Sequence, residues 1–107
     1  MAVSRFDIFL VNLDPTVGSE VKKTRRCLII SPPELNDIMH TVIIAPVTSK
    51  ISKYPMRIQV KVNELEGEIM LDQIRSVDKQ RLVKKVGHIR GKTQNILCET
   101  LQEMFKK

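Results

Sequence analysis

The sequence contains no tryptophan, a single tyrosine (Tyr54) and only four glycines. So few glycines leave no glycine-rich phosphate-binding loop. No apolar run approaches the roughly 18 residues that a membrane-spanning helix needs, and the first residues, MAVSRFDIF, lack the apolar centre of a signal peptide. We therefore expect a cytoplasmic protein that crosses no membrane.

Cysteine and histidine are also scarce. Cys27 and Cys98 are too few for a disulfide framework, and we expect both to be buried, reduced thiols. His40 and His88 stand in no metal-ligand spacing with either cysteine, and neither has the context of a Ser-His-Asp triad. The sequence therefore predicts neither a metal nor a cofactor.

The 107 residues suit one domain that spans the whole chain, 1–107, and 42% hydrophobic residues suffice for one small core. Burial in a chain of this size is marginal, so a subunit interface would add stability. The net charge of +6 favours an anionic partner, nucleic acid first. A merely soluble basic surface explains the charge equally well.

The stretch 13–32, LDPTVGSEVKKTRRCLIISP, organises the rest of the chain. Pro15 should end the first strand, and Gly18 allows a tight turn. The loop then carries one carboxylate, Glu20, and the chain re-enters an apolar strand. A long loop between short strands usually has a function. Four cations lie between this carboxylate and the first apolar residue of that strand, Cys27: Lys22, Lys23, Arg25 and Arg26.

The remaining pattern is several short strands followed by one helix. The alternation RIQVKV at 57–62 predicts a half-exposed strand. Pro46 places the strand at 41–47 at an edge or next to a bulge, 63–67 reads as a turn, and Thr93 is the expected N-cap of the last helix. Further strands are predicted at 7–13, 25–31, 68–71, 74–77 and 83–89, with short helical turns at 34–37 and 78–81. We expect a mainly β, antiparallel small barrel with a C-terminal α-helix.

Two groups at strand ends are able to bind an anion. Arg25 lies at a loop-to-strand junction, and Thr48 and Ser49 follow the strand at 41–47. If these two strands pair, their ends bring a guanidinium and two hydroxyls together, and a phosphodiester is the natural ligand. The alternative is a surface arginine and an ordinary turn at a strand end.

Four ordered blocks resemble the MazF/PemK family of toxin endoribonucleases: DIFLVNLDPTVGSE, TRRCLIISP, VIIAPVTS and LDQIRSVDKQRL. The resemblance covers nearly the whole chain. It implies an SH3-like barrel, a homodimer, and inhibition by a cognate antitoxin whose acidic tail fills the basic groove. It also implies cleavage of single-stranded RNA at short sequences without a metal. By the same resemblance, the 2′-hydroxyl of the RNA is expected to attack the phosphate and to leave a cyclic phosphate and a 5′-hydroxyl. Such cleavage of messenger RNA would stop translation and growth.

The resemblance assigns Arg25 and Thr48 to the catalytic positions of the family. Arginine is effectively always protonated, so we expect Arg25 to stabilise charge on the phosphate rather than act as a base. Glu20 is a candidate base or a partner that orients Arg25. Ser49 is expected to support catalysis from the groove.

Where the family has proline after the catalytic arginine, this chain has Arg26. Arg26 either competes for phosphate or points away on the opposite strand face. Tyr54 is either a platform for base stacking or an anchor of its loop, and Gln73 either lines the groove or is a buried structural amide. The residues expected to bind RNA are Lys22, Lys23, Arg26, Lys50, Lys53, Tyr54, Arg57 and Gln73.

Two other functions remain open at this point. Toxins of the same fold bind DNA gyrase and cut no RNA, and such a protein would need a partner-binding surface in place of the Arg25–Thr48 pair. A plain nucleic-acid-binding barrel would bind RNA by charge and leave it intact. The presence of both residues in their family context favours the nuclease.

Overall fold

The computed structural model describes residues 2–13 and 24–107, and Leu65 only in its backbone. The predicted loop at 14–23, with Glu20, Lys22 and Lys23, lies outside the described residues. The strands are β1 (Asp7–Asn12), β2 (Thr24–Ile29), β3 (Thr41–Thr48), β4 (Arg57–Val62), β5 (Leu65–Met70), β6 (Arg75–Asp78) and β7 (Leu82–His88). The helices are α1 (Pro33–Asn36), the 3-10 turns η1 (Leu71–Gln73) and η2 (Lys79–Arg81), and α2 (Lys92–Phe105).

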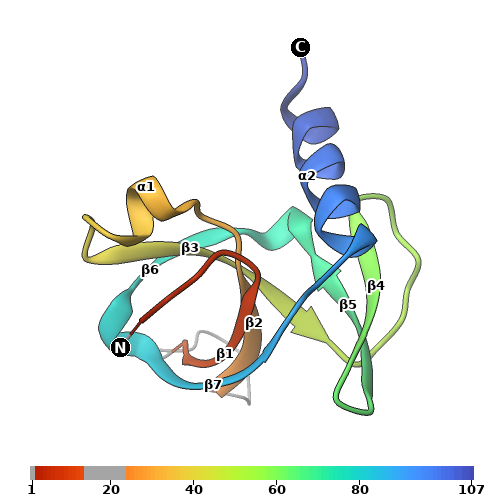
Figure 1. Cartoon of the computed structure of the whole chain (residues 1–107). Helices are drawn as coiled ribbons and strands as arrows, with labels where there is room; N and C mark the ends of the chain where they lie inside the picture. The colour runs from red at the N-terminus through yellow and green to blue at the C-terminus, as the bar shows by residue number, and fades with distance from the viewer. Residues whose placement is uncertain (1, 14–23) are drawn as a thin grey trace.

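The strands form one antiparallel sheet in the order β4-β5-β3-β2-β1-β7, with β6 paired to β3. The sheet curls so that β4 and β5 stand opposite β7 and β1, which gives an open half-barrel (Figure 1). Helix α2 follows β7 and carries the C-terminus away from the sheet. The predicted mainly β fold with a C-terminal helix is confirmed.

Both faces of β1 and β2 are covered, because successive side chains of a strand point to opposite faces. Ile8 and Leu28 enter one buried cluster, which also holds Leu97 of α2. Phe9 and Cys27 enter a second cluster on the other face. The site described below therefore stands on strands that are packed from two sides.

Of the two alternatives predicted for Pro46, an edge strand or a nearby bulge, the edge strand is ruled out. Strand β3 pairs with β2 along one side, where Cys27 lies opposite Pro46. Along its other side β3 pairs with β6 up to Ile44 and with β5 from Val47 onward. Pro46 lies between these two partners, where a missing backbone N–H breaks no pairing.

The turn predicted at 63–67 is shorter than expected. β4 and β5 form a hairpin in which Asn63 and Glu64 have φ of 50° and 70°, as a two-residue turn between twisted strands requires. Gly67 therefore lies inside β5 and not in the turn. The alternation of β4 is confirmed, since Ile58, with Val60 and Val62, packs against the core.

Helix α2 begins differently from the prediction. Its N-cap is Gly91, with φ of 68° and no side-chain cap, and Thr93 lies in the first turn. Leu97 is fully buried, but the predicted apolar face is only partly covered: Ile96 is 47% and Phe105 68% exposed. The helix thus leaves apolar surface toward solvent.

A buried carboxylate joins the start of β1 to the end of β7. Asp7 accepts hydrogen bonds from the Ser4 N–H at 2.9 Å and binds Nδ1 of His88 at 2.7 Å. The ammonium group of Lys85 lies 3.1 Å from the same carboxylate. Burial alone would raise the pKa of Asp7, but the bonds from His88, Ser4 and Lys85 hold that pKa below its ordinary value of 3.8.

This depressed pKa predicts a loss of stability in acid. The unfolded chain binds a proton at Asp7 at a higher pH than the folded chain does, so the free energy of unfolding falls as the pH drops below about 4. Asp7→Asn should remove that part of the pH dependence and cost about 1–3 kcal/mol at neutral pH. Urea unfolding between about pH 6 and pH 3 measures both effects. If the free energy of unfolding of Asp7→Asn falls with pH as steeply as that of the wild type, Asp7 is not the group responsible.

Candidate active site

Arg25, Thr48 and Ser49 line one pocket of about 280 Å³. They come together because β2 and β3 are antiparallel neighbours in which Cys27 pairs with Pro46. The same register, carried two residues toward the strand ends, sets Arg25 against Thr48. The two strands that carry Arg25 and Thr48 therefore pair, as the predicted anion site requires. The other lining residues are Leu10, Thr24, Arg26 and Val47.

Thr48 ends β3 and is half-buried. Its Oγ1 accepts a hydrogen bond from the Lys50 N–H at 3.2 Å. A hydroxyl that accepts one such bond keeps its own hydrogen as a donor. On the other side Thr48 pairs with Glu68 of β5, so the hydroxyl is held by a strand with neighbours on both sides.

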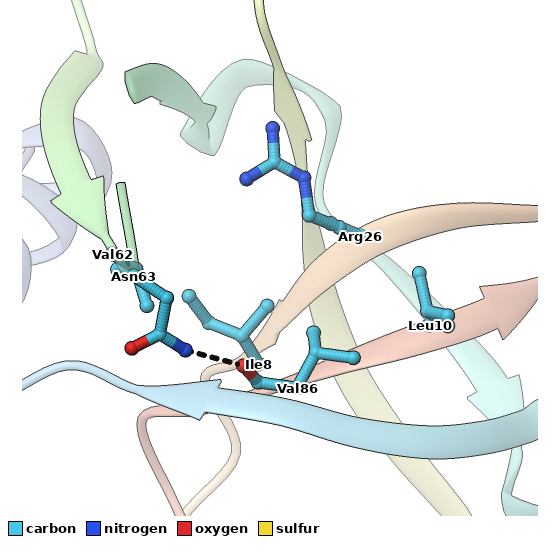
Figure 2. Close-up of a pocket in the computed structure, with 6 residues that line it drawn as sticks. All are labelled: Ile8, Leu10, Arg26, Val62, Asn63 and Val86. Atoms are coloured by element: carbon cyan, nitrogen blue, oxygen red, sulfur yellow. Dashed lines mark hydrogen bonds between the residues drawn. The ribbon is translucent and has the colours of Figure 1, made fainter. Parts of the chain in front are cut away.

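Arg26 borders two pockets, and its predicted competition for phosphate stays a prediction. It lines the Arg25–Thr48 pocket and also a neighbouring apolar pocket of about 170 Å³. Figure 2 shows the Arg26 guanidinium above the apolar side chains of this second pocket. Leu10 also borders both pockets, so the two hollows adjoin. The remaining lining residues of the apolar pocket are Ile8, Val62, Asn63 and Val86.

One wall of the apolar pocket is held by a side-chain amide. Asn63, from the turn between β4 and β5, donates a hydrogen bond from Nδ2 to the carbonyl oxygen of Val86 at 3.0 Å (Figure 2). This bond ties the hairpin to β7 across the opening of the half-barrel.

The segment between β3 and β4, residues 49–56, carries further predicted RNA contacts. Lys50 and Lys53 are exposed, and the ring of Tyr54 is 60% exposed. The guanidinium of Arg57 lies 5.0 Å from the centroid of that ring. Tyr54 therefore offers one face to solvent while a cation stands near the ring.

The guanidinium of Arg57, which was predicted to bind RNA, is bound to the carboxylate of Asp72. Its Nε and Nη2 donate to the two oxygens of Asp72 at 3.1 and 3.2 Å. These bonds raise the pKa of Arg57 and lower the pKa of Asp72. Such a two-point contact fixes the plane of the guanidinium.

Gln73 is exposed in η1, which rules out the alternative of a buried structural amide. It lines neither of these two pockets, and its expected contact with RNA stays a prediction. Sequence reasoning missed Glu68, which is completely buried in β5 beside Thr48. A single glutamate within an apolar strand carries no signal that distinguishes it from a solvent-facing residue. Its partners are backbone groups distant in sequence, which no motif encodes.

The cysteines take no part in the pocket chemistry. Burial raises the pKa of the Cys27 thiol to about 12, so the thiol is inert, as expected. Cys98 is free but only half-buried, where full burial was predicted. Across residues 2–13 and 24–107, no three His, Cys, Asp or Glu side chains are grouped to hold a metal ion. No helix in those residues is long and apolar enough to cross a membrane.

Residues 4–105 match the family described as PemK-like, MazF-like toxins of type II toxin–antitoxin systems. The chain is 34% identical over 108 residues to Endoribonuclease EndoA of Bacillus subtilis (strain 168). That match covers 95% of this chain and 93% of the relative. The similarity therefore extends over both proteins and is not confined to the pocket.

Solved structures share the fold at lower identity. The chain superposes on MazF from Deinococcus radiodurans with a TM-score of 0.82 and 20% identity, over 100% of this chain and 99% of that one. A mycobacterial endoribonuclease in complex with its cognate antitoxin gives a TM-score of 0.81 and 19% identity, over 95% and 93% of the two chains. These two superpositions place the half-barrel and its C-terminal helix among known architectures.

Proposed function

Because the chain belongs to the PemK-like, MazF-like toxins of type II toxin–antitoxin systems, we propose that it is an endoribonuclease that cuts single-stranded RNA without a metal ion. One observation carries the proposal: a guanidinium and two hydroxyls, from Arg25, Thr48 and Ser49, line one pocket. This set binds a phosphodiester and stabilises added negative charge on it.

In the proposed reaction the 2′-hydroxyl of the RNA attacks the adjacent phosphorus. The bond from phosphorus to the 5′-oxygen breaks, which leaves a 2′,3′-cyclic phosphate and a 5′-hydroxyl. Arg25 stabilises the charge on the pentacoordinate phosphate, and the Thr48 hydroxyl donates to one of its oxygens. The 2′ proton passes to a base, for which Glu20 is the candidate, and the leaving 5′-oxygen takes up a proton from solvent water.

The neighbouring surface suits an unpaired RNA strand. Lys50 and Lys53 would follow the backbone, and these contacts should weaken as salt is raised. The apolar pocket beside Arg26 is able to take a splayed base, with the Asn63 amide at its rim. Tyr54 would stack on a second base. Base contacts of this kind would give the cleavage its sequence preference.

Two parts of the surface suit the expected partners, an antitoxin and a second copy of the chain. An acidic, flexible antitoxin tail would bind the basic groove and exclude RNA. The solvent-exposed Ile96 and Phe105 of α2 provide apolar surface for a second copy of the chain, in keeping with a homodimer. In the cytoplasm the free toxin would cut messenger RNA and so inhibit translation and growth.

The test uses three substrates of one sequence: single-stranded RNA, the same RNA in a duplex, and single-stranded DNA. Each is incubated with the purified protein in excess EDTA, and the products are separated on a denaturing gel. We expect discrete cuts in the single-stranded RNA alone, because DNA lacks the attacking hydroxyl and a duplex hides its bases. Cleavage of the DNA, or intact RNA with a folded protein, would contradict the proposal.

A further inference from the structure

Glu68 is a buried carboxylate whose hydrogen-bond donors lie outside its own strand. It is 0% exposed in the middle of β5, between β3 and β4. A buried carboxylate is costly unless hydrogen bonds and nearby cations compensate for its lost hydration. Its hydrogen-bond donors lie in the segment 49–56, which adjoins the Arg25–Thr48 pocket through Ser49.

One oxygen of Glu68 holds the backbone of that segment. Oε2 accepts hydrogen bonds from the Ser52 N–H at 3.0 Å and the Lys53 N–H at 2.7 Å. Bonds to a charged acceptor are stronger than those between neutral groups. Two successive N–H groups aimed at one carboxylate oxygen leave the backbone at this point little freedom.

The other oxygen connects the segment to its far end. Oε1 of Glu68 lies 3.9 Å from Nη1 of Arg57 and accepts no hydrogen bond from the residues that the structure describes. Arg57 in turn holds Asp72 and lies against the ring of Tyr54. Glu68 thus contacts two groups: the backbone in the middle of the segment, and Arg57, whose guanidinium lies beside Tyr54, the only aromatic residue of the segment.

The segment itself adopts a backbone that it would not choose unaided. Lys53 and Met56 have φ of 59° and 66°, in the left-handed region that residues with a side chain rarely occupy. Such strain persists where the surroundings enforce it, and it is concentrated at functional sites. The enforcing contacts are the Glu68 bond to Lys53 and the bond from the Leu71 N–H to the Met56 carbonyl at 3.2 Å.

We infer that Glu68 is a positioning residue for RNA sequence selection. It holds the 49–56 segment in the conformation that presents Tyr54 to a base next to the cut phosphate. The inference rests on the proposed endoribonuclease function and adds to it a residue outside the pocket. If it holds, losing the carboxylate relaxes the choice of sequence more than it slows the chemistry at Arg25.

Two substitutions of Glu68 distinguish the effect of its hydrogen-bond acceptors from the effect of its buried volume. Glu68→Gln keeps the shape and one acceptor oxygen for the Ser52 and Lys53 N–H groups. Glu68→Met fills a similar volume and removes both acceptors, and replacing a buried charge by an apolar side chain often preserves folding. Asp7→Asn serves as the matched control, because it alters another buried carboxylate, at the β1–β7 junction.

Hydrogen exchange reports on the segment independently of cleavage. In Glu68→Met the Ser52 and Lys53 amides should exchange at least about tenfold faster, while core amides keep their protection. Glu68→Gln should retain most of the wild-type protection. Unchanged exchange at Ser52 and Lys53 in Glu68→Met would overturn the inference.

Cleavage kinetics measure how the Glu68 substitutions change the choice of RNA sequence. With Glu68→Met we expect the preference for the best sequence over a one-base variant to fall about tenfold, with a higher KM and with kcat within about threefold of wild type. Glu68→Gln should restore the preference, and Asp7→Asn should keep it. If Glu68→Met and Asp7→Asn lose the sequence preference equally, the cause is general destabilisation and the inference is overturned. A wild-type protein that cuts no RNA overturns the proposed function instead, and the exchange rates then decide alone whether Glu68 holds the segment.

Discussion

Arg25→Ala is expected to lower kcat for RNA cleavage by about 10²–10³-fold while leaving the fold intact. The guanidinium lines the pocket beside Thr48 and Ser49, and removing one group that stabilises transition-state charge costs about that much. The loss should fall on kcat more than on KM, because the charge on phosphorus is greatest in the transition state. Single-turnover cleavage of a labelled RNA at saturating enzyme measures it.

Two controls accompany that variant. Arg25→Lys keeps the charge but not the planar set of donors, and should recover only part of the activity. Lys106→Ala removes one positive charge just beyond α2, where the chain projects away from the sheet (Figure 1), and this variant should cut at the wild-type rate. Equal activity in Arg25→Ala and Lys106→Ala would mean that the site is elsewhere.

Gly67→Ala is expected to damage both stability and cleavage, through the strand that carries Thr48. A Cβ at Gly67 would stand 2.6 Å from the Thr48 carbonyl oxygen and 3.1 Å from Cγ1 of Val47. Backbone atoms cannot yield as a side chain can, so β5 must move away from β3. Overpacking of this kind costs about 1–3 kcal/mol. Denaturant unfolding and kcat are measured on the same preparation.

Gly91→Ala is the matched control for that substitution. Its Cβ meets nothing within 4 Å, but its φ of 68° is strained for alanine. It should therefore lose about 1 kcal/mol of stability without a change in kcat. A Gly67→Ala protein that retains the wild-type kcat would show that close contact between β5 and β3 does not position Thr48.

The pocket was predictable because its residues follow from strand order. An apolar run on each side of a basic loop indicated two neighbouring strands, and the strand containing Pro46 followed next. Antiparallel pairing of β2 and β3 then brings Arg25 to Thr48. The family resemblance added the roles of these two residues, and their roles in this chain stay predictions.

The predictions that failed share a physical cause: the local propensity of a residue does not reveal which distant residues it contacts in the folded chain. Pro46 predicts an edge or a nearby bulge, yet β3 is an inner strand that exchanges β6 for β5 at that point and needs no N–H there. Gly67 reads as a turn residue, yet its lack of a side chain serves close strand packing. Glu68 was missed altogether, because its partners are backbone N–H groups that only the folded chain brings near.

The most direct test of the account changes one atom of the substrate. After the cut site has been mapped in excess EDTA, a short RNA is synthesised with a single 2′-deoxy nucleotide on the 5′ side of the cut phosphate. The account predicts that the all-ribose RNA is cut there to a 5′-hydroxyl product, and that the deoxy RNA stays intact. Cleavage of the deoxy RNA at the same bond would mean attack by water and would contradict the mechanism assigned to Arg25 and Thr48.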